Sequence, residues 1–241
     1  EIKVAQLGGY VSEHSAYHHG EMSLMNTIIN MAQTFIGSNN VNLLSPNGQF
    51  GTRLTGGSDA ASPRYIYTCL TNIARAIFCP DDDAILNYLT DDGMSIEPEY
   101  YAPIVPMILV NGSVGIGTGF STDIPSCDIQ QVIKCVRSWI EAMQTKKKWP
   151  THGDEDGLIP YYHGFTGRIV RTDDVVDKHD SSRHFAKYLS IGSYEVVDRD
   201  KEIIHITELP IGTWTDDYKA FLDKLETEGI IFGYTNASTE M

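Results

Sequence analysis

Hydrophobic side chains recur at helical spacing in several stretches of the chain. Between residues 13 and 36 they predict a core helix, and its first turn would carry His18, His19 and Glu21. The same spacing predicts further helices over residues 70–78, 129–140 and 216–225. Asp128 stands directly before the second of these and is expected to act as its N-cap.

Runs of β-branched and aromatic residues predict the extended segments. Short strands are expected over residues 41–44, 65–68 and 104–111, and alternation after Gly164 predicts a β-rich second region. The acidic runs at 80–83 and 91–93 are interpreted as solvated turns. Helix, turn, helix and short strands are typical of a winged-helix domain. We therefore expect an α+β fold, with a winged-helix domain over residues 1–104 and a β-rich domain over residues 105–241.

A glycine-rich stretch over residues 47–68 presents Arg64 and Tyr65 at its far end. Its glycines let the backbone approach a ligand closely. Ionising a phenol near pH 7 costs about 4 kcal/mol, and an adjacent guanidinium can supply part of this cost or bind a phosphate oxygen. Most such pairs are an ordinary surface cation beside a half-buried ring. The pair by itself therefore leaves both interpretations open.

The charge balance and the cysteines limit the possible partners and compartments. The net charge of −14 has the wrong sign for a nucleic-acid binder, but residues 1–75 hold four basic and four acidic side chains, so the rest of the chain carries the whole excess. We expect weak binding to duplex DNA by this chain on its own. No apolar run of about 18 residues and no secretory signal are present, so no membrane partner is expected. Cysteines without metal-site or redox spacing predict buried reduced thiols and an intracellular protein.

Five sequence blocks occur in an order that closely resembles eukaryotic-type DNA topoisomerase II, a type IIA enzyme. They span residues 17–21, 36–40, 48–53, 63–68 and 115–120, and a last recognisable block spans residues 208–215. Bacterial gyrase and topoisomerase IV carry looser versions of these blocks. The resemblance implies a fragment of the DNA breakage and reunion core, made of a winged-helix domain and part of a tower domain.

The resemblance also implies the roles of individual residues. Tyr65 would attack a DNA phosphodiester to give a 5′-phosphotyrosyl linkage, Arg64 would stabilise the pentavalent phosphate, and His19 would support the same charge. Ile116 would intercalate and bend the DNA, although from the residues alone a buried strand isoleucine is the simpler interpretation. DNA contacts are further expected from His18, Met22, Gln49, Arg53 and Ser62. The basic run at 146–148 could contact phosphate or simply end a helix in solvent.

Cofactors and partners follow from the same resemblance. The complete enzyme would use ATP and Mg²⁺, act on double-stranded DNA as a homodimer, and reside in the nucleus or another DNA-containing compartment. The sequence contains neither an E-G-D-S block nor a D-x-D-x-D block, so we expect no metal site in this chain and no activity from it in isolation. Ser58 stands where lysine is usual in the family. The alternative is a non-catalytic winged-helix module that binds DNA or a protein.

Overall fold

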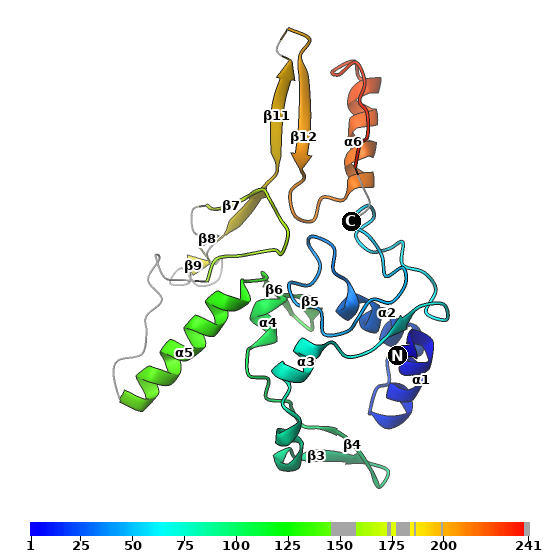
Figure 1. The fold of residues 1–241 in the computed structure, drawn as a ribbon, viewed down its shortest axis with the longest axis vertical. Coiled ribbons are helices and arrows are strands. Elements are labelled where there is room, and N and C mark those ends of the chain that lie inside the picture. Colours follow the sequence, from blue (N-terminus) through cyan, green and yellow to red (C-terminus); the bar gives the residue numbers. More distant parts are fainter. Residues whose placement is uncertain (146–157, 173–174, 177–183, 186, 199, 239–241) are drawn as a thin grey trace.

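The chain combines helices with small antiparallel strand pairs, as the predicted α+β class requires (Figure 1). The computed structural model describes residues 1–145, 158–172, 175–176, 184–185, 187–198 and 200–238. Its helices are α1 (Val4–His14), α2 (Glu21–Ala32), α3 (Asn72–Ile77), a 3-10 helix (Pro80–Ile85), α4 (Met107–Val110), α5 (Ile129–Thr145) and α6 (Thr215–Thr227). The basic run at 146–148 lies outside the described residues.

The strands of the described residues pair two by two. In chain order they are β1 (Ile2–Lys3), β2 (Tyr67–Thr68), β3 (Tyr88–Asp91), β4 (Met94–Pro98), β5 (Ser113–Gly117), β6 (Phe120–Ile124), β7 (Arg168–Arg171), β8 (Val175–Val176), β9 (His184–Phe185), β10 (Tyr188–Ile191), β11 (Ser193–Asp198) and β12 (Ile203–Glu208). The antiparallel pairs are β1 with β2, β3 with β4, β5 with β6, β7 with β10, β8 with β9, and β11 with β12. The second half of the chain is therefore β-rich, as predicted.

A first hydrophobic core holds α1 and α2 against the glycine-rich loop. Its buried members are Val4, Leu24, Ile28, Ile29, Ala32, Leu44, Phe50 and Ile66. Two backbone bonds fix the end of the loop to the start of α1, from Val4 N to Ile66 O (3.1 Å) and from Ala5 N to Pro63 O (3.1 Å). The segment around Tyr65 is thus anchored by the core beneath it.

The start predicted for the single helix between residues 13 and 36 is wrong. Helix α1 ends at His14 and α2 begins at Glu21, and His18 and His19 lie in the connection between them rather than in a first helical turn. Gly20, at φ 88°, adopts a conformation that glycine tolerates and that starts α2 at Glu21. Helix α1 was not predicted because its apolar positions are interrupted by glycine. Gly8 gives α2 room, since a Cβ there would lie 3.0 Å from Met25 Cγ.

Two predicted strands are also wrong. Within residues 41–44 only Leu44 forms a bridge, with Leu70. The run over 104–111 contains the short helix α4 instead of a strand. A short apolar run does not fix its own period, and here helical geometry places Val110 in a second core with Val105, Cys127 and Val132. The predicted domain division at residue 104 falls beside this second core and stays a prediction.

Asn40 connects distant parts of the chain through its side-chain amide. Its Nδ2 donates to the carbonyl oxygens of Val110 (3.0 Å), Cys127 (3.1 Å) and Tyr161 (2.9 Å), and its Oδ1 accepts from His163 N (2.8 Å). Val110 and Cys127 flank the β5–β6 hairpin. The amide therefore ties both ends of that hairpin to the segment that follows α2.

Most of the remaining predictions of local structure are correct, but the acidic run at 80–83 forms the start of the 3-10 helix instead of a turn. Asp128 Oδ1 accepts hydrogen bonds from Gln130 N (2.7 Å) and Gln131 N (3.1 Å), which confirms it as the cap of α5. Helices α3 and α6 and strand β2 occur where they were predicted. The β11–β12 hairpin and α6 project from the body of the molecule (Figure 1).

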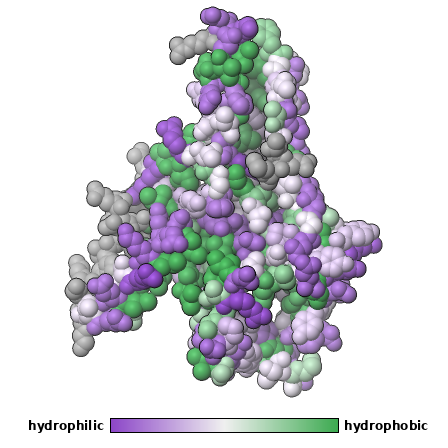
Figure 2. Space-filling model, viewed as in Figure 1, coloured by the Kyte–Doolittle hydropathy of each residue, from purple (hydrophilic) through white to green (hydrophobic). Residues whose placement is uncertain are grey.

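The surface is mixed in polarity. Figure 2 shows apolar surface in the middle of one face and on the projecting β11–β12 hairpin, where Tyr194, Val197 and Ile204 are exposed. Within the described residues, every helix is too short or too polar to cross a bilayer. All four cysteines are free thiols, and of these Cys127 is buried while the others are partly exposed. The expectation that the thiols are buried is thus correct for one position.

Candidate functional site

Side-chain hydrogen bonds add to backbone hydrogen bonds in holding the loop that leads to Tyr65. Asp59 accepts hydrogen bonds from Thr52 N (2.8 Å), Thr52 Oγ1 (2.6 Å) and Thr55 Oγ1 (2.7 Å). Burial raises the pKa of Asp59, but these hydrogen bonds outweigh it and keep the pKa below its usual value. From the other side, Gln33 Nε2 donates to Phe50 O (2.9 Å) and Gly57 O (3.4 Å). The loop therefore has a defined shape.

Two glycines of the loop are required by close approach. Gly51 has φ 97°, and a Cβ on it would lie 2.6 Å from Gly57 Cα. Gly56 has φ 65°, and a Cβ there would lie 2.3 Å from Cε2 of Trp214. Any larger residue would strain the backbone at either place and displace a neighbour. The sequence correctly predicts a close approach of this backbone, but the partner at Gly56 is an indole of the same chain.

Tyr65 is exposed at the end of this loop with a cation over its ring. Its side chain and backbone together are 69% exposed, while the next residue, Ile66, is buried in the first core. The Arg64 Cζ lies 5.3 Å from the centroid of the Tyr65 ring. Ser62 organises the turn, because its carbonyl accepts from Tyr65 N (2.9 Å) and its hydroxyl accepts from Arg64 Nε (3.4 Å). A rigid backbone thus presents an accessible phenol beside a guanidinium.

A cavity of about 460 Å³ lies between α2 and the same loop. The residues that line it are uncharged and are Met22, Asn26, Ile29, Asn30, Gly56, Gly57, Ser58, Ala60, Ala61, Ser62 and Pro63. Met22 and Ser62, both predicted DNA contacts, therefore line one hollow, and another of its lining residues, Pro63, directly precedes Arg64 in sequence.

The other predicted contacts of this part of the chain lie at the surface. His18, His19 and Gln49 are exposed, and the His19 ring packs edge to face on Tyr17 with ring centroids 5.6 Å apart. Gln49 also supports the loop, because its carbonyl accepts from Ala61 N (2.9 Å). The three side chains are therefore accessible to a ligand, and the roles given to them stay predictions.

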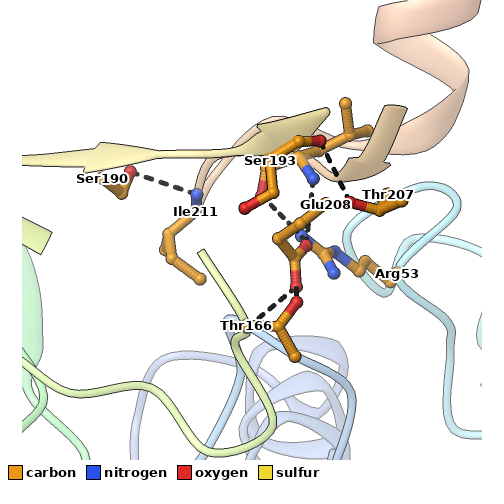
Figure 3. A network of polar contacts seen from close by, with 8 residues as sticks. Arg53, Thr166, Ser190, Ser193, Thr207, Glu208 and Ile211 are labelled. Carbon is orange, nitrogen blue, oxygen red and sulfur yellow. Dashed lines mark hydrogen bonds and ion pairs between the residues drawn. The ribbon is translucent and has the colours of Figure 1, made fainter. Parts of the chain in front are cut away.

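Arg53 points into the chain, toward the end of β12 (Figure 3). Its Nη2 lies 2.6 Å from Glu208 Oε1 and donates to Leu209 O (2.8 Å), and the Arg53 side chain is only 18% exposed. Burial raises the pKa of Glu208, but hydrogen bonds from Thr166 and Arg53 outweigh it and hold the pKa below its usual value. Sequence reasoning gave Glu208 no role. A phosphate contact of Arg53 stays a prediction, and its guanidinium is already engaged within the chain.

Ile116 lies on a separate hairpin and is the most exposed isoleucine of the described residues, at 95%. It pairs with Ser121 across β5 and β6, and Gly115 and Gly117 flank it. The alternative interpretation as a buried strand isoleucine is therefore wrong. A bare apolar side chain on a narrow, glycine-flanked strand has the form of a wedge.

Comparison with known proteins shows the family to which the chain belongs. The model of a protein family that comprises the A subunits of DNA gyrase and topoisomerase IV matches residues 1–240, and the chain belongs to this family. The resemblance to DNA topoisomerase II is likewise confirmed. A probable DNA topoisomerase 2 of Dictyostelium discoideum is 49% identical over 229 residues, which make up 95% of this chain and 14% of that protein. The mitochondrial DNA topoisomerase 2 of the same organism is 48% identical over 240 residues, or 100% of this chain and 17% of that protein.

A solved structure confirms the fold class. The crystal structure of the Plasmodium falciparum topoisomerase II DNA-binding, cleavage and re-ligation domain matches with a TM-score of 0.84 and 45% sequence identity. The match covers 99% of this chain and 30% of that chain. The chain therefore has the α+β fold of that domain, and it spans only 14% and 17% of the length of the two relatives.

Proposed function

We propose that the chain supplies the nucleophile of an ATP-dependent type II DNA topoisomerase, which cuts both strands of one duplex, passes a second duplex through the gap and reseals it. One observation carries the proposal. Tyr65 is exposed at the end of a braced loop, with the guanidinium of Arg64 5.3 Å from its ring centroid. Membership of the family supports it. The exposed phenol is the group of this chain to which we assign the cutting of DNA.

The proposed reaction exchanges one phosphodiester for another. The Tyr65 oxygen attacks phosphorus, a new oxygen–phosphorus bond forms at the 5′ end, and the bond to the 3′ oxygen breaks. The phenol proton ends on the released 3′-hydroxyl, and religation runs the same steps backwards. Because one ester replaces another, the cut itself needs no ATP. Arg64 stabilises the charge on the pentavalent phosphate, and His19 assists from the connection before α2.

Mg²⁺ and ATP belong to the proposal for the complete enzyme. Among the described residues, no group of three or more His, Cys, Asp or Glu side chains is arranged to hold a metal ion. These residues do not fit a magnesium site, so no step is assigned to a metal here. We place both cofactors in other regions of the full-length protein.

The partners follow from the stoichiometry of the chemistry. One Tyr65 cuts one strand, so cutting a duplex requires two copies of the chain, and we propose a homodimer. We propose the nucleus as its location, with another DNA-containing compartment as the alternative. Ile116 would bend the cut duplex, and the hollow lined by Met22 and Ser62 would face its backbone.

Tyr65→Phe in the full-length protein tests the chemistry directly. The substitution removes one oxygen and leaves the ring, so we expect DNA binding to persist and the covalent protein–DNA adduct to fall to background. The adduct is measured on denaturing gels after incubation with nicked duplex and Mg²⁺. Tyr67→Phe, two residues away in β2, is the control and should leave the adduct yield unchanged. Normal yield from Tyr65→Phe would assign the chain to non-catalytic DNA binding.

Arg64→Ala separates stabilisation of the reacting phosphate from simple positioning. Loss of one preorganised donor at a charge that develops during reaction costs about 100-fold in rate. We therefore expect the rate of adduct formation to fall about 100-fold, while the Kd for duplex rises far less. Single-turnover cleavage and fluorescence anisotropy measure the two quantities. Equal losses in both would make Arg64 a DNA-binding residue only.

A further inference from the structure

The sequence block at 208–215 has no part in the cleavage chemistry, yet it packs on the loop that carries the nucleophile. Glu208 holds Arg53 at 2.6 Å, and Asp216 N donates to Leu54 O (3.0 Å). The Trp214 indole covers Gly56 so closely that a methyl group there would overlap it. The end of β12 and the start of α6 thus contact the loop at residues 53, 54 and 56, and the contact of Arg53 with Leu209 joins positions 156 residues apart.

Glu208 is held firmly enough to act as a fixed point. Its side chain is 4% exposed. Its Oε2 accepts from Thr166 N (3.1 Å) and Thr166 Oγ1 (2.9 Å), and its Oε1 accepts from Leu209 N (3.0 Å) besides the contact with Arg53 (Figure 3). A buried carboxylate with donors on both oxygens has little freedom to move. Its position is therefore set by the β-rich part of the molecule.

Polar contacts and short stretches of backbone connect Arg53 to Tyr65. Thr52, next to Arg53, is bound to Asp59 through both its N–H and its hydroxyl. Asp59 lies three residues before Ser62, which accepts the Tyr65 N–H. The loop is thus fixed at its tip by Glu208, while the bond from Ala5 N to Pro63 O fixes its exit to α1.

We propose that Arg53 and Glu208 are positioning residues, whose ion pair sets the placement of the loop and hence the reach of the Tyr65 oxygen toward phosphorus. This inference rests on the proposed function. It replaces an external role for Arg53 with an internal one. The two roles predict opposite effects on Arg53 when Glu208 is lost. A phosphate-binding Arg53 would be freed by loss of Glu208, whereas a positioning Arg53 would be disabled by it.

Glu208→Gln in the full-length protein tests the inference, because it keeps the shape of the side chain and removes its charge. A displacement of a reacting group by about 1 Å costs on the order of 100-fold in rate. We expect the rate of adduct formation at saturating duplex to fall at least about tenfold, as a partial displacement would cause, with Kd unchanged. Glu195→Gln makes the same change at an exposed position of the same hairpin and should leave both quantities unchanged. An unchanged rate, or a tighter Kd, in Glu208→Gln would overturn the inference.

Substitutions at Arg53 provide a second test of the inference. Arg53→Met should slow adduct formation as Glu208→Gln does, and Arg53→Lys should recover part of the rate. The double variant with Arg53→Met and Glu208→Gln should form the adduct no more slowly than either single variant, since the two residues act as a unit. The slope of log affinity against log salt should not change. A slope lower by about one would instead make Arg53 a phosphate contact. Additive losses in the double variant would also refute the coupling.

Two further measurements, thermal unfolding and DNA binding, distinguish a loss of folding from a loss of function. Thermal unfolding defines a temperature at which each variant is folded, and the rates are compared there. A merely structural pair would lower adduct yield and DNA binding together, in proportion to the folded fraction, which contradicts the positioning role. An unsubstituted protein that forms no adduct would refute the proposed function and this inference together. An adduct that depends on Tyr65 but not on Glu208 would refute the inference only.

Discussion

At the scale of single residues, Asp59 is the side chain that gives the glycine-rich loop over residues 47–68 its shape. Thr52 and Thr55 direct their hydroxyls at it, and Thr52 adds its backbone N–H. The carboxylate form accepts all of these hydrogen bonds, which is why they keep its pKa below the usual value in spite of burial. Protonation of Asp59 therefore works against the folded loop.

The pH dependence of stability follows with a definite sign. Because the pKa of Asp59 is lower in the folded chain than its unperturbed value of 3.8, its contribution is complete well above that value and is lost as the pH falls below it. Asp59→Asn should lower the free energy of unfolding by roughly 1–2 kcal/mol at pH 7 and by less at pH 3. Urea unfolding at both pH values measures this. Asp81→Asn, at an exposed position, is the control, and an equal loss at both pH values would contradict the prediction.

The residue pattern placed Arg64 beside Tyr65 but left open whether the phenol is accessible, and it did not predict the partner of Arg53. Arg64 and Tyr65 are neighbours in sequence, so their proximity follows from the chain itself. Arg53 and Glu208 meet only because the β-rich part folds back on the loop, and no local spacing encodes that return. An isolated arginine in a loop therefore resembles a phosphate ligand until its tertiary partner is known.

At the scale of elements, the β5–β6 hairpin presents apolar side chains to solvent. Val114, Ile116 and Phe120 are all at least 84% exposed, although each would gain free energy by burial. The hairpin is held at its base, since Asn40 donates to Val110 and Cys127 on either side of it. A firmly based strand with an exposed apolar tip can enter a base step without folding away.

Ile116→Ala tests this wedge. Unstacking a base step costs a few kcal/mol, and an inserted side chain compensates for it. We expect the variant to destabilise the bent duplex by about 2 kcal/mol and to reduce the mean bend. Resonance energy transfer between dyes at the two duplex ends measures the bend in the full-length complex. Ile85→Ala, an exposed isoleucine in the 3-10 helix, should leave it unchanged. An unaltered bend in Ile116→Ala would remove the wedge role.

Element prediction succeeded where the pattern was long or capped and failed where it was short. Helix α5 has both a sustained apolar face and the Asp128 cap, and it forms as predicted. The run containing α4 is too short to distinguish a helix from a strand, and packing of Val110 decides the outcome. Helix α1 contains Gly8 and Gly9, which weaken a helical pattern, and tertiary contact with α2 stabilises it instead.

At the scale of the whole molecule, charge opposes the proposed substrate. The net charge is −14, while residues 1–75, which carry Tyr65, are balanced. Long-range repulsion from the rest of the chain therefore acts on any duplex that approaches the phenol. In the full-length protein, basic surface outside these 241 residues would have to offset it.

The isolated chain should consequently bind duplex weakly. Non-specific protein–DNA complexes at physiological salt have Kd values of about 1 to 100 μM, and we expect this chain at or beyond the weak end of that range. Fluorescence anisotropy of a labelled duplex, repeated over a salt series, provides the measurement. The full-length protein serves as the comparison and should bind more tightly and with a steeper salt slope. A submicromolar Kd for the chain by itself would refute the expectation.

The hydrogen bonds of the Asn40 amide constrain the order in which the chain can fold during its synthesis. The acceptor oxygen of this amide finds His163, 123 positions later in the sequence, so the ribosome must synthesise that whole interval before the last bond can close. At about 5 to 20 residues per second this takes roughly 6 to 25 seconds. The bonds from Asn40 Nδ2 to the carbonyl oxygens of Val110 and Cys127 span only 70 and 87 positions. They can therefore form earlier, and the segment that follows α2 is fixed in stages as the chain is synthesised.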